Sequence, residues 1–71
     1  MHTMHHVESS NIEAIGHDAE AQELHVRFAK GGGTYVYTGV EAETFDEFMK
    51  ADSKGSYLSR NIKGSYPFRK V

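Results

Sequence analysis

GGGTYVYTGV, residues 31–40, joins three consecutive glycines to a run of β-branched and aromatic residues. The glycines tolerate the positive φ angles of a tight reversal, and the residues after them suit a pleated strand. The preceding run, Leu24-His25-Val26-Arg27-Phe28, alternates apolar and polar residues with the period of a half-buried strand. Together the two runs predict a β-hairpin at the centre of the domain.

The register of this hairpin sets the face that its two tyrosines occupy. If the turn is centred on residues 31–32, Tyr35 pairs with Phe28 and Tyr37 with Val26, so both rings face the core. A slip of one residue places both rings on the open face, beside the histidine and arginine of the earlier strand, as a platform for stacked bases. We expect the first register, because a thin sheet needs large side chains to cover its core.

A further strand is predicted before the hairpin, over residues 12–17, and a short polar turn over residues 18–22 links it to the next strand. The short turn favours a second hairpin. The sequence therefore predicts a three-stranded antiparallel β-meander, with strands near residues 11–17, 23–29 and 34–40.

The period changes after the meander. Phe45, Phe48 and Met49 stand at helical spacing and predict a helix over residues 41–51 that covers one face of the sheet. Leu58 and Ile62, four residues apart, predict a second short helix over residues 56–63. Pro67 disfavours a helix before it, so residues 65–71 are expected to be extended. The predicted fold is α+β, with a three-stranded antiparallel β-meander followed by two short helices (β-β-β-α-α).

The length of 71 residues allows one small domain with a thin core. We divide the chain into a flexible N-terminal arm over residues 1–8, polar and rich in histidine, and a single domain over residues 9–71. The absence of cysteine excludes disulfides and thiolate zinc sites. The sequence shows no secretory signal and no apolar run that could span a bilayer, so we expect a cytoplasmic protein without a membrane partner.

The sequence contains no catalytic constellation. Its serines and histidines lack the surroundings of a nucleophile elbow, and so small a core leaves little room for a water-excluding pocket. His2, His5 and His6 are potential metal ligands, but no fixed carboxylate or cysteine accompanies them. We therefore expect no enzyme, no metal site and no cofactor.

Charge is distributed unevenly along the chain. Residues 1–49 carry two basic and nine acidic side chains, a net charge of −7, whereas residues 50–71 carry six basic and one acidic, a net charge of +5. Such a split is typical of a localised anion-binding face. A solvated surface with complementary charges would give the same counts.

Several groups of residues, in a fixed order with short gaps, resemble the KTSC domain. They are Val7-x-Ser9-Ser10-x-Ile12-x-x-Ile15-Gly16-x-Asp18, then Leu24-x-Val26-x-Phe28, then Tyr35-x-Tyr37 with Gly39-Val40, and finally Ala51-x-Ser53-x-Gly55-x-Tyr57 with Ile62 and Tyr66. The resemblance implies a small domain that occurs alone, often in bacterial or phage proteins, and at the C-terminus of some lysyl-tRNA synthetases. That context suggests RNA binding. Two positions depart from the pattern, since His17 stands where an aromatic residue is expected and Glu41 stands where proline often follows the valine.

The basic, tyrosine-containing C-terminal part of the chain is the candidate site for nucleic acid. Its cations can neutralise phosphates, and its aromatic rings can stack on unpaired bases. The predicted site residues are Lys54, Tyr57, Arg60, Lys63, Tyr66, Arg69 and Lys70. They predict a non-catalytic domain that binds RNA or DNA. A plainer interpretation assigns the aromatic residues to the core and the cations to an ordinary solvated surface.

The free edge of a three-stranded sheet provides an alternative function. An unpaired edge strand can pair with a second copy of the chain or with another protein. The sequence therefore also allows a homodimer, or a protein-interaction module of a phage or plasmid.

Overall fold

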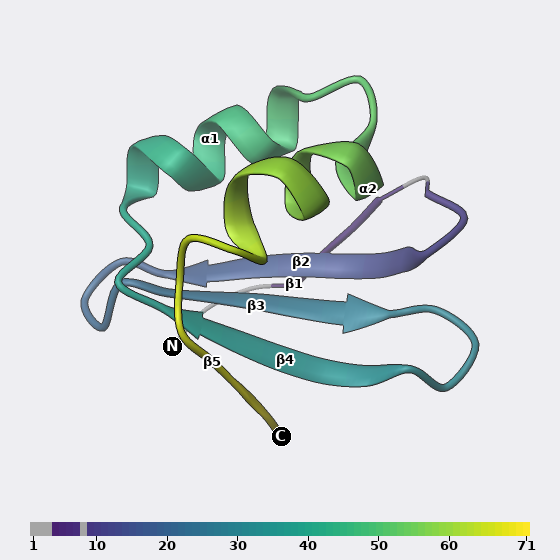
Figure 1. Ribbon diagram of the computed structural model, residues 1–71, viewed down its shortest axis with the longest axis horizontal. Helices are drawn as coiled ribbons and strands as arrows, with labels where there is room; N and C mark the ends of the chain where they lie inside the picture. The colour runs from purple at the N-terminus through teal and green to yellow at the C-terminus, as the bar shows by residue number, and fades with distance from the viewer. Residues whose placement is uncertain (1–3, 8) are drawn as a thin grey trace.

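The computed structural model describes residues 4–7 and 9–71, and in this part of the chain five antiparallel strands form one sheet in the order β1-β2-β3-β4-β5 (Figure 1). The strands are β1 (Met4–His6), β2 (Ile12–Asp18), β3 (Glu23–Phe28), β4 (Gly33–Thr38) and β5 (Phe68–Lys70). The predicted meander is present as β2, β3 and β4. The α+β class is confirmed, whereas the predicted number of three strands is wrong.

The first additional strand, β1, pairs with β2 although its residues belong to the segment predicted as a flexible arm. Just after β1, the N–H of Val7 donates a hydrogen bond to the carbonyl of Glu13 (3.1 Å). Val7 is buried, so this segment also contributes to the core. Residues 1–3 and 8, the rest of the predicted arm, lie outside the described residues.

The second additional strand, β5, pairs with β4. The extended end predicted from Pro67 is confirmed, and it continues as a strand. The carbonyl of Pro67 accepts a hydrogen bond from Thr38 (3.0 Å), and the N–H of Val71 donates one to the carbonyl of Thr34 (2.9 Å). Both edges of the predicted meander are therefore covered, and each outer strand is only three residues long.

The helical layer lies on one side of the sheet (Figure 1). It consists of α1 (Ala42–Lys50), α2 (Lys54–Tyr57) and a π-helical segment, η1 (Leu58–Ile62), which follows α2 directly. Both predicted helices are present, although the second begins two residues earlier than predicted. Phe48 on α1 is fully buried, and Phe45 and Met49 pack against the core from partly buried positions, as their spacing predicts.

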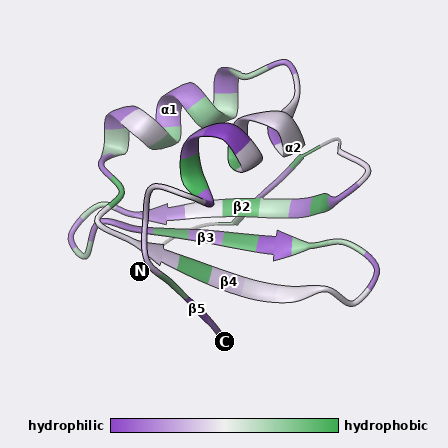
Figure 2. Cartoon of the chain, in the orientation of Figure 1, coloured by the Kyte–Doolittle hydropathy of each residue, from purple (hydrophilic) through white to green (hydrophobic). Residues whose placement is uncertain are grey.

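The core lies between the sheet and the helical layer, and hydrophobic stretches occur along β2, β3 and β4 as well as in the helices (Figure 2). Its buried members come from β2, β3, β4, α1, η1 and the segments that follow β1 and β4: Val7, Ile12, Ile15, Leu24, Val26, Tyr37, Val40, Phe48, Leu58 and Ile62. Leu58 and Ile62, the pair whose spacing predicts the second helix, are among them. The core therefore fixes the position of α2 and η1 over the sheet.

The central hairpin reverses at residues 30 and 31. Lys30 and Gly31 have positive φ angles of 57° and 75°, and the N–H of Gly32 donates to the carbonyl of Ala29 (3.2 Å). The predicted turn centre is therefore wrong by one residue, and the strand register differs by two. Three consecutive glycines allow positive φ at several positions, so the sequence does not fix the turn centre.

The tyrosines keep their predicted face, because faces repeat every two residues along a strand. Tyr35 lies opposite Val26, and Tyr37 lies opposite Leu24. Tyr37 is buried and Tyr35 is half-buried. The prediction that both rings face the core side is confirmed, and the partners named for them are corrected.

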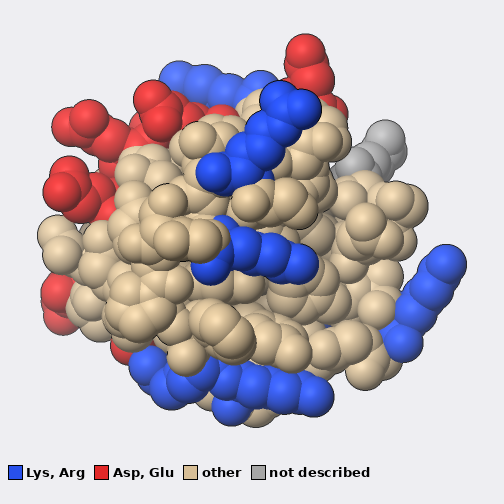
Figure 3. Space-filling model, in the orientation of Figure 1, with Lys and Arg blue, Asp and Glu red and all other residues tan. Residues whose placement is uncertain are grey.

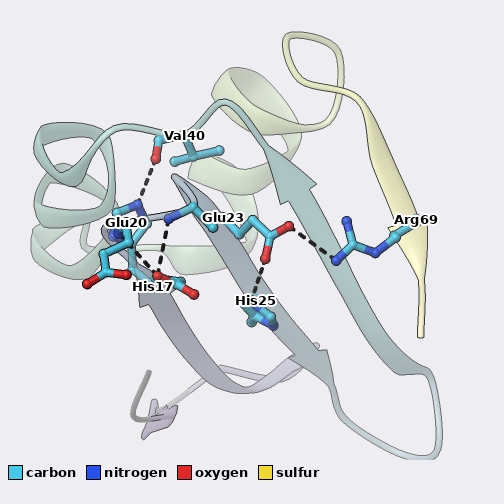
Figure 4. Close-up of polar contacts among 8 residues, drawn as sticks. His17, Glu20, Glu23, His25, Val40 and Arg69 are labelled. Atoms are coloured by element: carbon cyan, nitrogen blue, oxygen red, sulfur yellow. Dashed lines mark hydrogen bonds and ion pairs between the residues drawn. The ribbon is translucent and has the colours of Figure 1, made fainter. Parts of the chain in front are cut away.

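His17 occupies the position where the family resemblance leads to an aromatic residue. Its ring stacks on Phe45, with centroids 5.2 Å apart and planes 15° from parallel. Its Nε2–H donates a hydrogen bond to the carbonyl of Val40 (2.7 Å; Figure 4). The imidazole thus makes the ring contact of an aromatic side chain and also ties β2 to the segment that enters α1.

Candidate nucleic-acid interface

The structure divides the seven predicted site residues into two sets. One set takes part in contacts that hold the fold together, and the other lies at a solvent-exposed surface without an acidic partner among the described residues. The first set is Lys54, Tyr57, Tyr66 and Arg69. The second is Arg60, Lys63 and Lys70. A charge count along the chain cannot separate these sets, because their members are interspersed in the sequence.

Lys54 and Tyr57 join α2 to α1. The Nζ of Lys54 donates to the carbonyl of Ala51, just after α1, at 2.6 Å. The hydroxyl of Tyr57 donates to Oε1 of Glu47 (3.2 Å), and its ring stacks on Phe48 with centroids 5.3 Å apart. Burial raises the pKa of Tyr57, and the hydrogen bond to the Glu47 carboxylate raises it further. Both side chains therefore hold α2 against α1.

Arg69 lies on β5 and contacts the open face of the sheet. Its Nη2 is 3.2 Å from Oε2 of Glu23, while Oε1 of the same carboxylate is 3.6 Å from Nε2 of His25 (Figure 4). This arginine is thus neutralised by an acidic side chain. Tyr66 packs against the core from a half-buried position and forms part of the support for the helices.

The three remaining cations lie on the helix-covered side of the molecule. Within residues 4–7 and 9–71, no acidic side chain pairs with Arg60, Lys63 or Lys70. Figure 3 shows Lys and Arg side chains over the centre, along the lower edge and at the top, whereas Asp and Glu are most numerous at the upper left, over α1. Most acidic side chains in this view therefore lie apart from the cations at the centre and the lower edge.

Lys63 lies at a shallow hollow with two aromatic rings. Its Nζ is 5.9 Å from the centroid of the Phe28 ring, and the rings of Phe28 and Tyr35 meet edge to face with centroids 5.3 Å apart. The hollow has a volume of 410 Å³ and is also lined by Asn11 and Gly32. We call it the aromatic hollow. Rings and a cation in this arrangement can contact an unpaired base and its phosphate.

Phe68 and Lys70 on β5 extend this surface. Phe68 is 56% exposed, and its ring contacts Tyr35 and Tyr37 with centroids 5.5 and 5.6 Å away. Lys70 pairs with Tyr35 in the sheet register and passes so close to Gly33 that a Cβ there would lie 2.9 Å from its Cε. We use the name basic–aromatic face for Arg60, Lys63 and Lys70 together with Phe28, Tyr35 and Phe68.

A second hollow adjoins the first and shares Asn11 with it. It has a volume of 330 Å³ and is rich in hydroxyl groups. Its lining residues are Ser9, Ser10, Asn11, Ser53, Gly55, Ser56, Ser59 and Arg60. We call it the serine hollow. It brings together segments that lie more than forty positions apart in the sequence.

Several members of this surface are absent from the predicted site, namely Asn11, Phe28, Tyr35 and Phe68. Phe28 and Tyr35 are predicted to be core residues, and they do pack against the core, but each also lines the aromatic hollow. They lie at the end of the hairpin, near the turn, where the helical layer leaves them half-buried. The sequence signal that could have indicated the partial exposure of Phe28 and Tyr35 is their position close to the glycine-rich turn.

Metal ligands do not gather in the described part of the chain, where no group of three or more His, Asp or Glu side chains could hold an ion. His2, one of the predicted potential ligands, lies outside the described residues. His5 and His6 are neighbours on β1 and therefore point to opposite faces of the sheet. No helical segment of the described residues is long and apolar enough to cross a membrane.

The fold and this surface define a small α+β domain with a five-stranded sheet covered on one side by helices. The model of the KTSC domain family matches residues 8–66, and the chain belongs to that family. A protein from Tsukamurella paurometabola is 45% identical over 60 residues, which are 84% of this chain and 88% of that protein. A protein from Stutzerimonas stutzeri is 33% identical over 57 residues, covering 80% of this chain and 79% of that protein.

The three-dimensional comparison agrees. The crystal structure of a KTSC domain protein from Yersinia pestis has a TM-score of 0.95 and 37% sequence identity to this chain, and the match covers 100% of this chain and 99% of that one. The family membership indicated by the sequence motifs is confirmed.

Proposed function

We propose that this protein binds nucleic acid, and RNA in the first place, through the basic–aromatic face. The observation that carries the proposal is that Arg60, Lys63 and Lys70 lack acidic partners among the described residues. Lys63 and Lys70 lie beside the rings of Phe28 and Tyr35, and Arg60 lines the adjoining serine hollow. Such cations displace the counterions of a phosphate backbone, and the rings stack on bases that are not paired.

The ligand class follows from the kind of contact. Stacking needs unpaired bases, which single strands and the loops of folded RNA provide. The resemblance to domains attached to a tRNA-handling enzyme makes RNA the first ligand to test, with DNA as the second. Acidic side chains over α1 repel phosphates, so only one side of the molecule can engage and the affinity at physiological salt should be modest.

The test is a charge reversal with a salt series. Arg60→Glu combined with Lys63→Glu should weaken binding of unrelated RNA oligonucleotides by about tenfold or more, because phosphate contacts carry little sequence information. If each side chain neutralises one phosphate of a single strand, the slope of log affinity against log salt should fall by about 1.4. Fluorescence anisotropy with labelled oligonucleotides measures both quantities.

A matched control separates a local contact from a change in overall charge. Lys50→Glu, at the exposed end of α1, alters the net charge as much as either single reversal does. It should leave the salt slope nearly unchanged. Equal loss of affinity in the control and in the single reversals would remove the support for a defined face.

A protein partner at a sheet edge is the alternative to be distinguished. The outer strands β1 and β5 are short, which limits strand addition, although they still offer unpaired backbone groups. Affinity through a mainly apolar edge should not fall log-linearly with salt. Light scattering at low and high concentration tests whether a second copy of the chain is the partner.

A further inference from the structure

The serine hollow has a lining that matches a small, multiply charged oxyanion. Arg60 supplies a permanent positive charge, and the serines supply hydroxyl donors from two separate segments of the chain. No acidic side chain of the described residues lines this hollow. An anion would find a positive charge and several N–H and O–H donors in such a lining, whereas a cation would meet the charge of Arg60 and no carboxylate of the described residues.

Two of the hydroxyls are already oriented by the backbone. Ser9 Oγ accepts a hydrogen bond from the N–H of Asn11, and Ser53 Oγ accepts one from the N–H of Ser56, both at 3.3 Å. A hydroxyl that accepts such a bond keeps its own proton for another acceptor. Within the described part of the chain, the hydroxyls of Ser10, Ser56 and Ser59 make no hydrogen bond, so they too can donate to a ligand.

The aromatic hollow lies directly beside this site, since Asn11 lines both. One hollow offers hydroxyls and a guanidinium, and the other offers the rings of Phe28 and Tyr35 with the cation of Lys63. Phosphate and base are the two parts of a nucleotide that need these two environments. Two adjacent hollows of complementary character are therefore explained by one ligand.

We propose that the serine hollow binds the phosphate monoester of a nucleotide, at the end of a strand or on a free mononucleotide, while the aromatic hollow holds its base. The proposal rests on the proposed function and specifies which part of a nucleic acid this end of the face recognises. A monoester has three unsubstituted oxygens and a charge near −2, whereas an internal phosphodiester has two such oxygens and one charge. The larger number of acceptors matches a hollow with five hydroxyls, an amide and a guanidinium.

The experiment compares RNA hexanucleotides of one sequence that carry a 5′-phosphate, a 3′-phosphate or hydroxyl groups at both ends. Adenosine monophosphate and adenosine serve as the mononucleotide pair. At least one phosphorylated strand should bind about tenfold more tightly than the hydroxyl-ended strand, as expected for a charge-assisted hydrogen bond. If adenosine monophosphate binds more tightly than adenosine but neither phosphorylated strand shows a gain, the ligand of the serine hollow is a free mononucleotide.

Two variants test the residues. Ser56→Ala combined with Ser59→Ala removes two donors and replaces them with the best helix-forming residue, so the fold should be retained. Arg60→Gln removes the charge. Each should abolish the preference for the phosphorylated ligand, and the double serine variant should leave the affinity for the hydroxyl-ended strand within about twofold. Ser65→Ala and Lys50→Gln, outside the hollow, should preserve the preference.

The outcomes separate the two proposals. Equal binding of phosphorylated and hydroxyl-ended ligands overturns the phosphate site and leaves nucleic-acid binding intact. A gain that survives in the double serine variant places the monoester elsewhere and also overturns it. Binding of adenosine monophosphate, with no strand bound at any salt concentration, supports the phosphate site and overturns the proposed function.

Discussion

Lys54 and Lys63 lie at the two ends of one helical segment, yet their side chains make different contacts. The ammonium of Lys54 is 2.6 Å from the carbonyl of Ala51 and holds the end of α1, whereas that of Lys63 lies over the Phe28 ring in the aromatic hollow. Arg69 resembles Lys54, because Glu23 neutralises it on the open face. A cation that already has a partner in the fold adds to the charge of the chain but adds little to a binding surface.

The largest expected effect concerns the packing that positions both lysines. Phe48 is fully buried and stacks on Tyr57, the last residue of α2, so Phe48→Ala leaves a cavity beneath the end of that helix. We expect the free energy of unfolding to fall by about 3–5 kcal/mol. Chemical denaturation measures it. A loss below about 1 kcal/mol would contradict the packing of α1 on the sheet.

The next prediction concerns the same substitution, to methionine, at each of the two lysines. Lys54→Met leaves the Ala51 carbonyl without its donor and should lower the free energy of unfolding by about 1–2 kcal/mol. Its affinity for a hydroxyl-ended RNA oligonucleotide should stay within about twofold of the original. Lys63→Met should show the opposite pattern, with stability unchanged within about 0.5 kcal/mol and affinity reduced severalfold.

Chemical denaturation measures the stability of the two variants, and fluorescence anisotropy measures their affinity for RNA. Equal loss of affinity in both variants would contradict the distinction, since the lysine with a partner in the fold and the lysine without one would then contribute equally to binding. A loss of stability in Lys63→Met alone would also contradict the distinction, because Lys63 would then have a structural role.

The smallest expected effect appears at alkaline pH. Burial raises the pKa of Tyr37 and of Tyr57, with Tyr35 adding to the effect on Tyr37 and Glu47 to that on Tyr57. Because the folded pKa lies above the unfolded value of about 10, this contribution is complete below pH 10 and is lost as pH rises through the folded pKa. Stability should therefore fall above about pH 10.

Denaturation midpoints between about pH 8 and 11 follow this loss. The double variant Tyr37→Phe and Tyr57→Phe has no phenol at these positions and should lose less stability over the same range. An equal fall in both proteins would show that other groups account for the alkaline loss.

The parts of the fold that the sequence predicts are those with long, regular patterns. β3 alternates apolar and polar residues, β4 is a run of β-branched and aromatic residues after the glycines, and α1 carries three apolar residues at helical spacing. β1 and β5 have only three residues each and read MHH and FRK. They are strands because the meander offers backbone partners at its edges, and that cause is tertiary.

The site was only partly predictable for a similar reason. Arg69 and Lys70 are adjacent in the sequence, but neighbours on a strand face opposite sides, so one pairs with Glu23 and the other joins the basic–aromatic face. Asn11 comes from a loop far from the basic segment and enters both hollows only through folding. Composition indicated the cations, whereas the partners of each cation depend on the three-dimensional arrangement.

The most direct test of the account is a titration of the isotope-labelled protein with a hydroxyl-ended RNA oligonucleotide at low salt, followed by NMR. We expect chemical-shift changes at residues 60–63 and around the β3–β4 turn, where the basic–aromatic face lies. Residues around Glu23 and His25 on the open face should stay unchanged. Shifts confined to that open face or to β1, or no shift anywhere between residues 54 and 70, would contradict it.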